Sequence, residues 1–143
     1  MKQNKFLSGA MALLLIAFCT ISWVNKKTNT TSPTPITITG TYDFSTFPNL
    51  NGTFVTSGAL NLSGTSTMNI SQNINGVIAH CEVTLTPSDG SGTIVIHQEC
   101  VFNTPIPQGR WEIVGGTGAY SNLKGNGSTT MPPNQEAMTG VIY

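Results

Sequence analysis

Short runs of alternating apolar and polar residues, separated by turn-forming residues, fill the chain from residue 36 to its end. In the two clearest runs, 77–85 and 94–102, every second residue is apolar or a cysteine apart from Gln98, and Pro-Ser-Asp-Gly at 87–90 separates them. This alternation is typical of antiparallel strands with one buried face, whereas no window beyond residue 24 has the 3.6-residue period of a helix. We expect strands at 36–44, 54–62, 68–73, 77–85, 94–102, 110–115, 125–131 and 136–143.

Eight up-and-down strands joined by tight turns predict an all-β fold, a single small antiparallel eight-stranded β-barrel. Closure of the sheet into a barrel is favoured because it leaves no strand edge unpaired. A two-sheet β-sandwich uses the same alternation and is the alternative.

The first 24 residues have the pattern of a signal peptide. Lys2 and Lys5 precede an apolar stretch at 6–18. We therefore expect export to the periplasm, the cell surface or the medium. One alternative is an uncleaved N-terminal anchor, since 6–24 approaches the roughly 20 residues that span a bilayer. The other is lipid attachment at Cys19, which Phe18 disfavours because a small residue precedes an acylated cysteine.

Two further segments complete the predicted organisation. Residues 25–35 contain only Asn, Lys, Thr, Ser and Pro, so we expect a disordered linker. Residues 36–143 are long enough for one domain with a single core.

Charge is sparse, at 8% of the residues, and from residue 28 onward only Arg110 and Lys124 oppose six acids. No basic patch is present to neutralise phosphates, which excludes nucleic acid as a predicted partner. We also expect no membrane contact beyond the N-terminal anchor just described.

Cys81 and Cys100 are predicted to form a disulfide. If the hairpin turn is centred on 89–92, directly opposed residues have numbers that sum to 181, which places the two cysteines opposite each other on the apolar face. An oxidising compartment would allow the bond, and it would contribute roughly 3 kcal/mol by loop entropy. The alternative is a reactive thiol or a metal site. No suitable third ligand accompanies the pair, so we expect neither a metal nor a cofactor.

The same register gathers His80, Glu82, His97 and Glu99 on the opposite face of this hairpin. It places Glu82 opposite Glu99, and such a cluster could serve acid–base catalysis or bind a divalent cation. We favour a solvated outer face, because the apolar face of the hairpin is the one that carries the cysteines.

The run at 115–127 contains five glycines. A dinucleotide fingerprint starting at Gly116 would need a third glycine where Ser121 stands and a helix after it, and 122–130 has no helical period. Glu136 follows Gly116 at close to the spacing of the acid that binds ribose in a dinucleotide site. Because the helix is missing, we interpret this spacing as coincidental. We expect a structural turn built on Gly115, Gly116, Thr117, Gly118, Tyr120, Gly125 and Gly127.

Two stretches around this turn carry a resemblance, Trp111-Glu112-Ile113-Val114-Gly115-Gly116-Thr117-Gly118-Ala119-Tyr120 and Leu123-Lys124-Gly125-Asn126-Gly127. They resemble the glycine-rich turn of the allene oxide cyclase and dirigent family of small β-barrels and of uncharacterised secreted bacterial proteins. The resemblance implies a barrel over roughly 39–143. In plants such barrels are associated with oxylipin cyclisation or with steering of phenoxy-radical coupling. It also implies a tendency to form homo-oligomers. No catalytic residue of either enzyme can be matched to a position here.

Three functional hypotheses follow. The preferred one is a non-catalytic exported barrel that binds a small apolar ligand or a surface partner. The second is a cyclase or isomerase acting on an apolar substrate, which an ionisable side chain buried in the barrel would favour. The third is a solid barrel with a purely structural or adhesive role. In all three, Trp111 is expected in the core.

Overall fold

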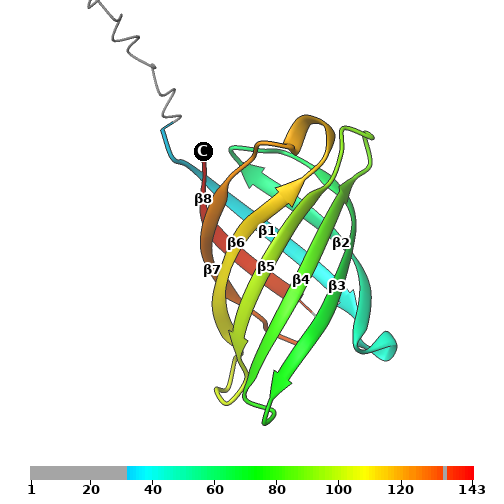
Figure 1. Cartoon of the computed structure of the whole chain (residues 1–143), viewed down its shortest axis with the longest axis vertical. Helices are drawn as coiled ribbons and strands as arrows, with labels where there is room; N and C mark the ends of the chain where they lie inside the picture. Colours follow the sequence, from blue (N-terminus) through cyan, green and yellow to red (C-terminus); the bar gives the residue numbers. More distant parts are fainter. Residues whose placement is uncertain (1–31, 134) are drawn as a thin grey trace, which may run out of the picture.

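The computed structural model describes residues 32–133 and 135–143, which form a closed antiparallel barrel (Figure 1). Its eight strands pair in sequence order, and the last pairs with the first, Thr34 lying opposite Ile142. This confirms the predicted eight-stranded barrel and rules out the sandwich. The predicted signal segment and most of the predicted linker lie outside the described residues. Among the described residues, no helix is long and apolar enough to cross a membrane.

The strands cover most of the described chain, and two short 3-10 turns lie in the connections between β1 and β2 and between β6 and β7. The strands are β1 (Thr34–Asp43), β2 (Asn49–Gly58), β3 (Ser63–Ile74), β4 (Ile78–Pro87), β5 (Ile94–Val101), β6 (Gln108–Gly116), β7 (Gly125–Thr130) and β8 (Gln135–Ile142). The 3-10 turns are η1 (Phe44–Thr46) and η2 (Gly118–Tyr120).

Alternation along each strand sends one set of side chains into the barrel and the other into solvent. In β4 every second residue from Ala79 to Pro87 is buried, and β5 follows the same rule from Ile94 to Cys100. Trp111 is buried as expected, and its Nε1 donates a 3.0 Å hydrogen bond to the carbonyl of Ser128. The interior is therefore a packed core that the period-two pattern of the sequence specifies.

The predicted second strand was placed too late in the chain. β2 begins at Asn49 and ends at Gly58, whose φ of +97° turns the backbone away from the strand direction. Leu60 and Leu62 lie in the connection to β3 and pack, partly buried, against the core. The Thr56 hydroxyl donates a 2.9 Å hydrogen bond to the carbonyl of Leu60, which holds this connection over the barrel end.

The glycine-rich connection between β6 and β7 folds back over the turn between β4 and β5. The amide of Ala119 donates to the carbonyl of Ser91 at 2.9 Å, and the buried Tyr120 places its hydroxyl 2.7 Å from Ser91 Oγ. Gly118 has φ +57°, and a Cβ there would lie 2.2 Å from the carbonyl oxygen of Ser91. This end of the barrel is therefore covered by the glycine turn, with Tyr120 as its plug.

Candidate functional site: an apolar pocket beside a buried carboxyl

The opposite end of the barrel holds a pocket of about 450 Å³. It lies among the connections that follow β1, β3, β5 and β7. No side chain in its lining is charged or carries a hydroxyl or amide group. The lining residues are Phe44, Phe47, Met68, Ile70, Gly76, Ala79, Cys81, Phe102, Pro107, Met131, Pro132 and Pro133.

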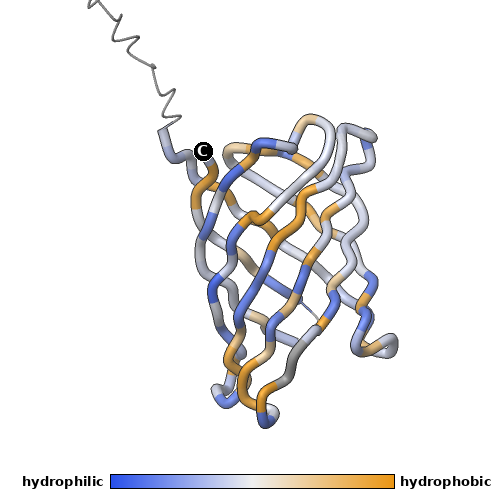
Figure 2. Tube along the Cα trace, in the orientation of Figure 1, coloured by the Kyte–Doolittle hydropathy of each residue, from blue (hydrophilic) through white to orange (hydrophobic). Residues whose placement is uncertain are grey.

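Exposed apolar side chains surround this pocket. Phe47 is 60% exposed; Phe44, Phe102 and Ile106, on connections at this end, and Ile74, the last residue of β3, are also exposed. Figure 2 shows the apolar colour gathering at the lower tips of the barrel, where the connections after β3 and β5 lie. We call this end, with the pocket and these five residues, the apolar end.

A polar network lies inside the barrel. Glu136, at the start of β8, is only 1% exposed, and its Oε1 accepts hydrogen bonds from Gln98 Nε2 at 2.7 Å and from Thr129 Oγ1 at 3.0 Å. Its Oε2 accepts a 3.2 Å hydrogen bond from the Tyr42 hydroxyl. The carboxyl group is thus held by three neutral donors from three other strands, and no cation among the described residues pairs with it.

Burial raises the pKa of the Glu136 carboxyl, and the hydrogen bonds from Gln98, Thr129 and Tyr42 offset only part of that effect. The pKa of the Tyr42 hydroxyl is also raised, first by burial and then by the nearby Glu136 carboxylate. Ser66 Oγ, buried in the same interior, has no hydrogen-bond partner among the described residues. Burial therefore keeps the proton on Glu136 to a higher pH than on an exposed carboxyl, whereas the three donated hydrogen bonds favour the carboxylate.

Cys81 belongs to the pocket and is influenced electrostatically by Glu136. It lines the pocket, and the pKa of its thiol is raised to about 11 by burial and, second, by the charge of Glu136. Burial likewise raises the pKa of Cys100 to about 12. Both thiols are therefore protonated at neutral pH, so Cys81 adds no charge to the lining of the pocket.

The predicted disulfide is not formed: Cys81 and Cys100 are both free thiols in the structure. The predicted register was wrong by two residues. Cys81 lies opposite Gln98, and Cys100 lies opposite Ala79, so the two cysteines are diagonal neighbours. Diagonal pairs have Cα atoms about 7–8 Å apart, beyond the usual disulfide range of about 4.4–6.8 Å.

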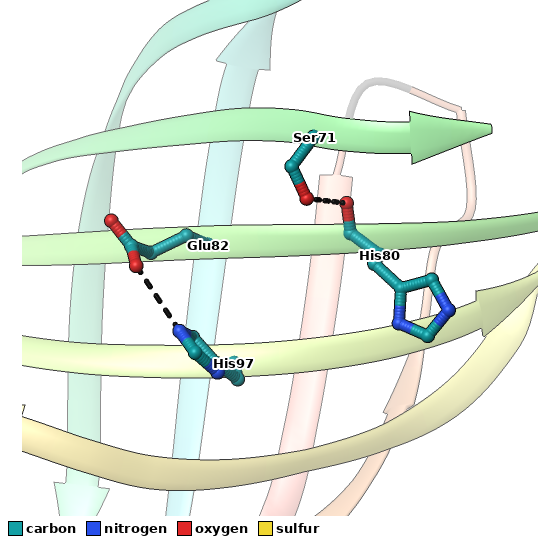
Figure 3. Close-up of polar contacts among 4 residues, drawn as sticks. All are labelled: Ser71, His80, Glu82 and His97. Atoms are coloured by element: carbon teal, nitrogen blue, oxygen red, sulfur yellow. Dashed lines mark hydrogen bonds and ion pairs between the residues drawn. The ribbon is translucent and has the colours of Figure 1, made fainter.

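The predicted polar cluster lies on the outside of the barrel, and Figure 3 shows three of its four residues, His80, Glu82 and His97. His97 Nε2 lies 3.1 Å from Glu82 Oε2, and both side chains are 54% exposed. The corrected register pairs Glu82 with His97 and His80 with Glu99, so each acid faces an imidazole rather than a second acid. Among the described residues no group of three His, Cys, Asp or Glu side chains is arranged to hold a metal ion. The cluster lies on the outer face, where Glu82, His97 and Glu99 are exposed, and none of its four residues lines the apolar pocket.

Sequence reasoning did not identify Glu136, Tyr42 and Gln98 as a group. One signal was present, because Glu136 shares its face of β8 with the buried residues Met138 and Ile142. Gln98 in the same way interrupts an otherwise apolar face of β5. An isolated polar residue at a core position of a strand is the pattern that marks such an interior network.

Comparisons of this chain with protein-family models, with curated proteins and with solved structures find no match.

Proposed function

We propose that this protein is an exported, non-catalytic barrel that binds one small apolar molecule in the pocket at its apolar end. The observation that carries the proposal is the lining of the pocket, which offers about 450 Å³ and no charged side chain, hydroxyl or side-chain amide. Ligand pockets typically have volumes of about 300–1,000 Å³ and mostly apolar walls. Export is part of the proposal on the basis of the basic and apolar pattern of residues 1–24.

The chemistry of the lining selects for a neutral ligand. A charged group entering the pocket would lose its hydration and find no partner, which costs several kcal/mol or more. An apolar ligand would instead cover side chains that water now contacts, and each fully buried large apolar side chain contributes about 1.5–3 kcal/mol. The pocket therefore favours an uncharged, water-insoluble molecule.

A fluorescence titration with N-phenyl-1-naphthylamine, a neutral apolar probe, tests this proposal. We expect saturable enhancement with one probe bound per barrel. Ile70 lines the pocket, so Ile70→Trp should fill part of it and abolish the enhancement. Val55→Trp, at an exposed position of β2 away from the pocket, is the matched control and should bind as the native chain does. Absence of saturable binding, or equal binding by Ile70→Trp, would refute the proposal.

A second candidate function is an isomerase or cyclase acting on an apolar substrate, in line with the resemblance of the glycine turn to the allene oxide cyclase and dirigent family. The observation that favours it is Glu136, a buried carboxyl near a pocket residue, Cys81. In this function a protonated Glu136 would give its proton to an apolar substrate and then take a proton back from it. A compound recovered from the protein would be incubated with fresh protein in D₂O. Catalysis would be supported if the native chain incorporates deuterium into the compound and Glu136→Gln binds the compound without incorporating deuterium. If the native chain incorporates none, the non-catalytic binder remains the proposed function.

A further inference from the structure

The connections at the apolar end combine exposed apolar side chains with a complete lack of charge. Phe44, Phe47, Ile74, Phe102 and Ile106 are each between 37% and 60% exposed. Residues 44–48, 75–77, 102–107 and 131–133 contain no Asp, Glu, Lys, Arg or His. Asp43, the last residue of β1, borders this end, and its carboxylate accepts a hydrogen bond from the Ser45 amide at 2.9 Å.

Charge is instead carried elsewhere on the barrel. Asp89 and Lys124 lie on connections at the opposite, plugged end, and Glu82, Glu99 and Arg110 lie on the outer wall. The molecule thus has one uncharged end with five exposed large apolar side chains, whereas those exposed elsewhere, Val55, Val114 and Tyr143, are fewer. Monomeric soluble proteins rarely expose clustered apolar side chains of this kind without a partner for them.

We propose that the apolar end docks on the surface of a lipid bilayer, with Phe44, Phe47, Phe102, Ile74 and Ile106 inserted among the lipids. The side chains come from the β1–β2 connection, the end of β3 and the β5–β6 connection, and three of them also line the pocket, so they match a fluid apolar medium that fills the space between them. Apolar anchors without charge suit zwitterionic lipid, because no counter-charge is needed for attraction. Asp43 would remain at the level of the polar headgroups.

Docking in this orientation places the opening of the pocket against the lipid. The pocket lies among the same connections that carry the exposed residues, and Phe44, Phe47 and Phe102 belong to both. An apolar compound dissolved in the bilayer would then reach the pocket without crossing water. The docking itself depends only on the exposed side chains and holds whether or not the pocket retains a ligand.

This inference departs from the sequence-based expectation of no membrane contact beyond an N-terminal anchor. The five side chains are spread from residue 44 to residue 106, so no window of the sequence shows an apolar run or an amphipathic helix. Only the closure of the barrel brings them to one end.

The experiment uses the full chain carrying Cys19→Ser, with a solvent-sensitive fluorophore on Ser45→Cys at the apolar end. The fluorophore should not label Cys81 and Cys100, because both are buried. With vesicles of phosphatidylcholine alone we expect a blue shift and protection from iodide. Ser57→Cys, exposed on β2, carries the control label and should remain aqueous. Comparing two label positions separates docking of this end from any lipid binding by residues 6–24.

Matched substitutions test which side chains cause the docking. Phe47→Ser combined with Ile106→Ser should lower the apparent lipid affinity at the Ser45 label about a hundredfold, because each buried side chain of this size contributes about a factor of ten or more. Val55→Ser, which removes an equally exposed apolar side chain from the wall, should change nothing. High salt should not weaken binding. An aqueous Ser45 label, or equal losses in all variants, would overturn the inference. A concentration-dependent shift without vesicles would overturn it in favour of a second copy of the chain.

Discussion

Glu136 Oε1 accepts a 2.7 Å hydrogen bond from Gln98 Nε2 in the interior of the barrel, between β8 and β5, which are not neighbours in the sheet. The contact crosses the inside of the barrel, so the buried carboxyl of β8 finds its hydrogen-bond donor on the facing strand β5. Buried hydrogen bonds of this kind fix the relative position of strands, but they also bury an ionisable group without a cation. The pH dependence of stability should reveal this group.

We expect Glu136→Gln to become progressively more stable than the native chain as the pH rises. The folded carboxyl holds its proton to higher pH than the unfolded one, because burial raises its pKa. The unfolded chain therefore releases this proton first, so the stability that Glu136 contributes is present below its ordinary pKa and is lost as the pH rises through the folded pKa. The loss is about 1.4 kcal/mol for each pH unit between the two values.

Urea unfolding of both chains from about pH 4 to pH 9 measures this difference. Glu112→Gln, at an exposed position of β6, is the control, and its difference from the native chain should not grow with pH. A difference for Glu136→Gln that is independent of pH would contradict a raised pKa of the Glu136 carboxyl.

Both cysteines of the barrel should be free and slow to react. The pKa values of about 11 for Cys81 and about 12 for Cys100 leave few thiolates at neutral pH, and both side chains are buried. Ellman's reagent should detect the two thiols only after unfolding in guanidinium chloride, in a sample never exposed to reductant. An intact mass two hydrogens lower, with no thiol released on unfolding, would show a disulfide instead.

Gly118→Ala should destabilise the barrel by about 1–3 kcal/mol, because Gly118 has φ +57° and its added Cβ would meet the Ser91 carbonyl. Gly115→Ala is the matched control, since no atom lies within 4 Å of a Cβ there, and it should stay within about 0.5 kcal/mol of the native chain. Thermal unfolding compares the two. Equal effects would mean that the close approach of the glycine turn to the β4–β5 turn does not contribute to stability.

The outer pair of Glu82 and His97 should contribute little. Exposed pairs of this kind give about 0.2–1 kcal/mol in double-mutant cycles. We therefore expect a coupling energy of that size from Glu82→Gln and His97→Gln, with unchanged binding of the apolar probe. A loss of probe binding in either variant would place the functional site on the outer face rather than at the apolar end.

The fold could be predicted from the sequence because alternation is a local signal that each strand carries by itself. The register of β4 and β5 could not, because 88–92 contains two glycines and permits several hairpin centres. Contacts from the distant glycine turn, such as Ala119 on Ser91 and Thr117 on Thr93, hold this hairpin end in the structure. Cys81 therefore faces Gln98, and the disulfide prediction failed with the register.

The candidate site was predictable only in part. An apolar ligand could be expected from the barrel, but the pocket is assembled from four connections that are far apart in the chain. Tyr42, Gln98, Thr129 and Glu136 likewise converge from four strands only when the barrel closes. Neither group leaves a spacing pattern that a linear motif could show.

Native mass spectrometry of the full chain recovered from its own host, intact and then denatured, tests the central claim most directly. We expect an extra mass that is reproducible, is lost on denaturation and is absent from the Ile70→Trp variant. That mass should belong to a neutral, water-insoluble compound. A bare polypeptide for the native chain, or the same extra mass in Ile70→Trp, would contradict ligand binding at the apolar end.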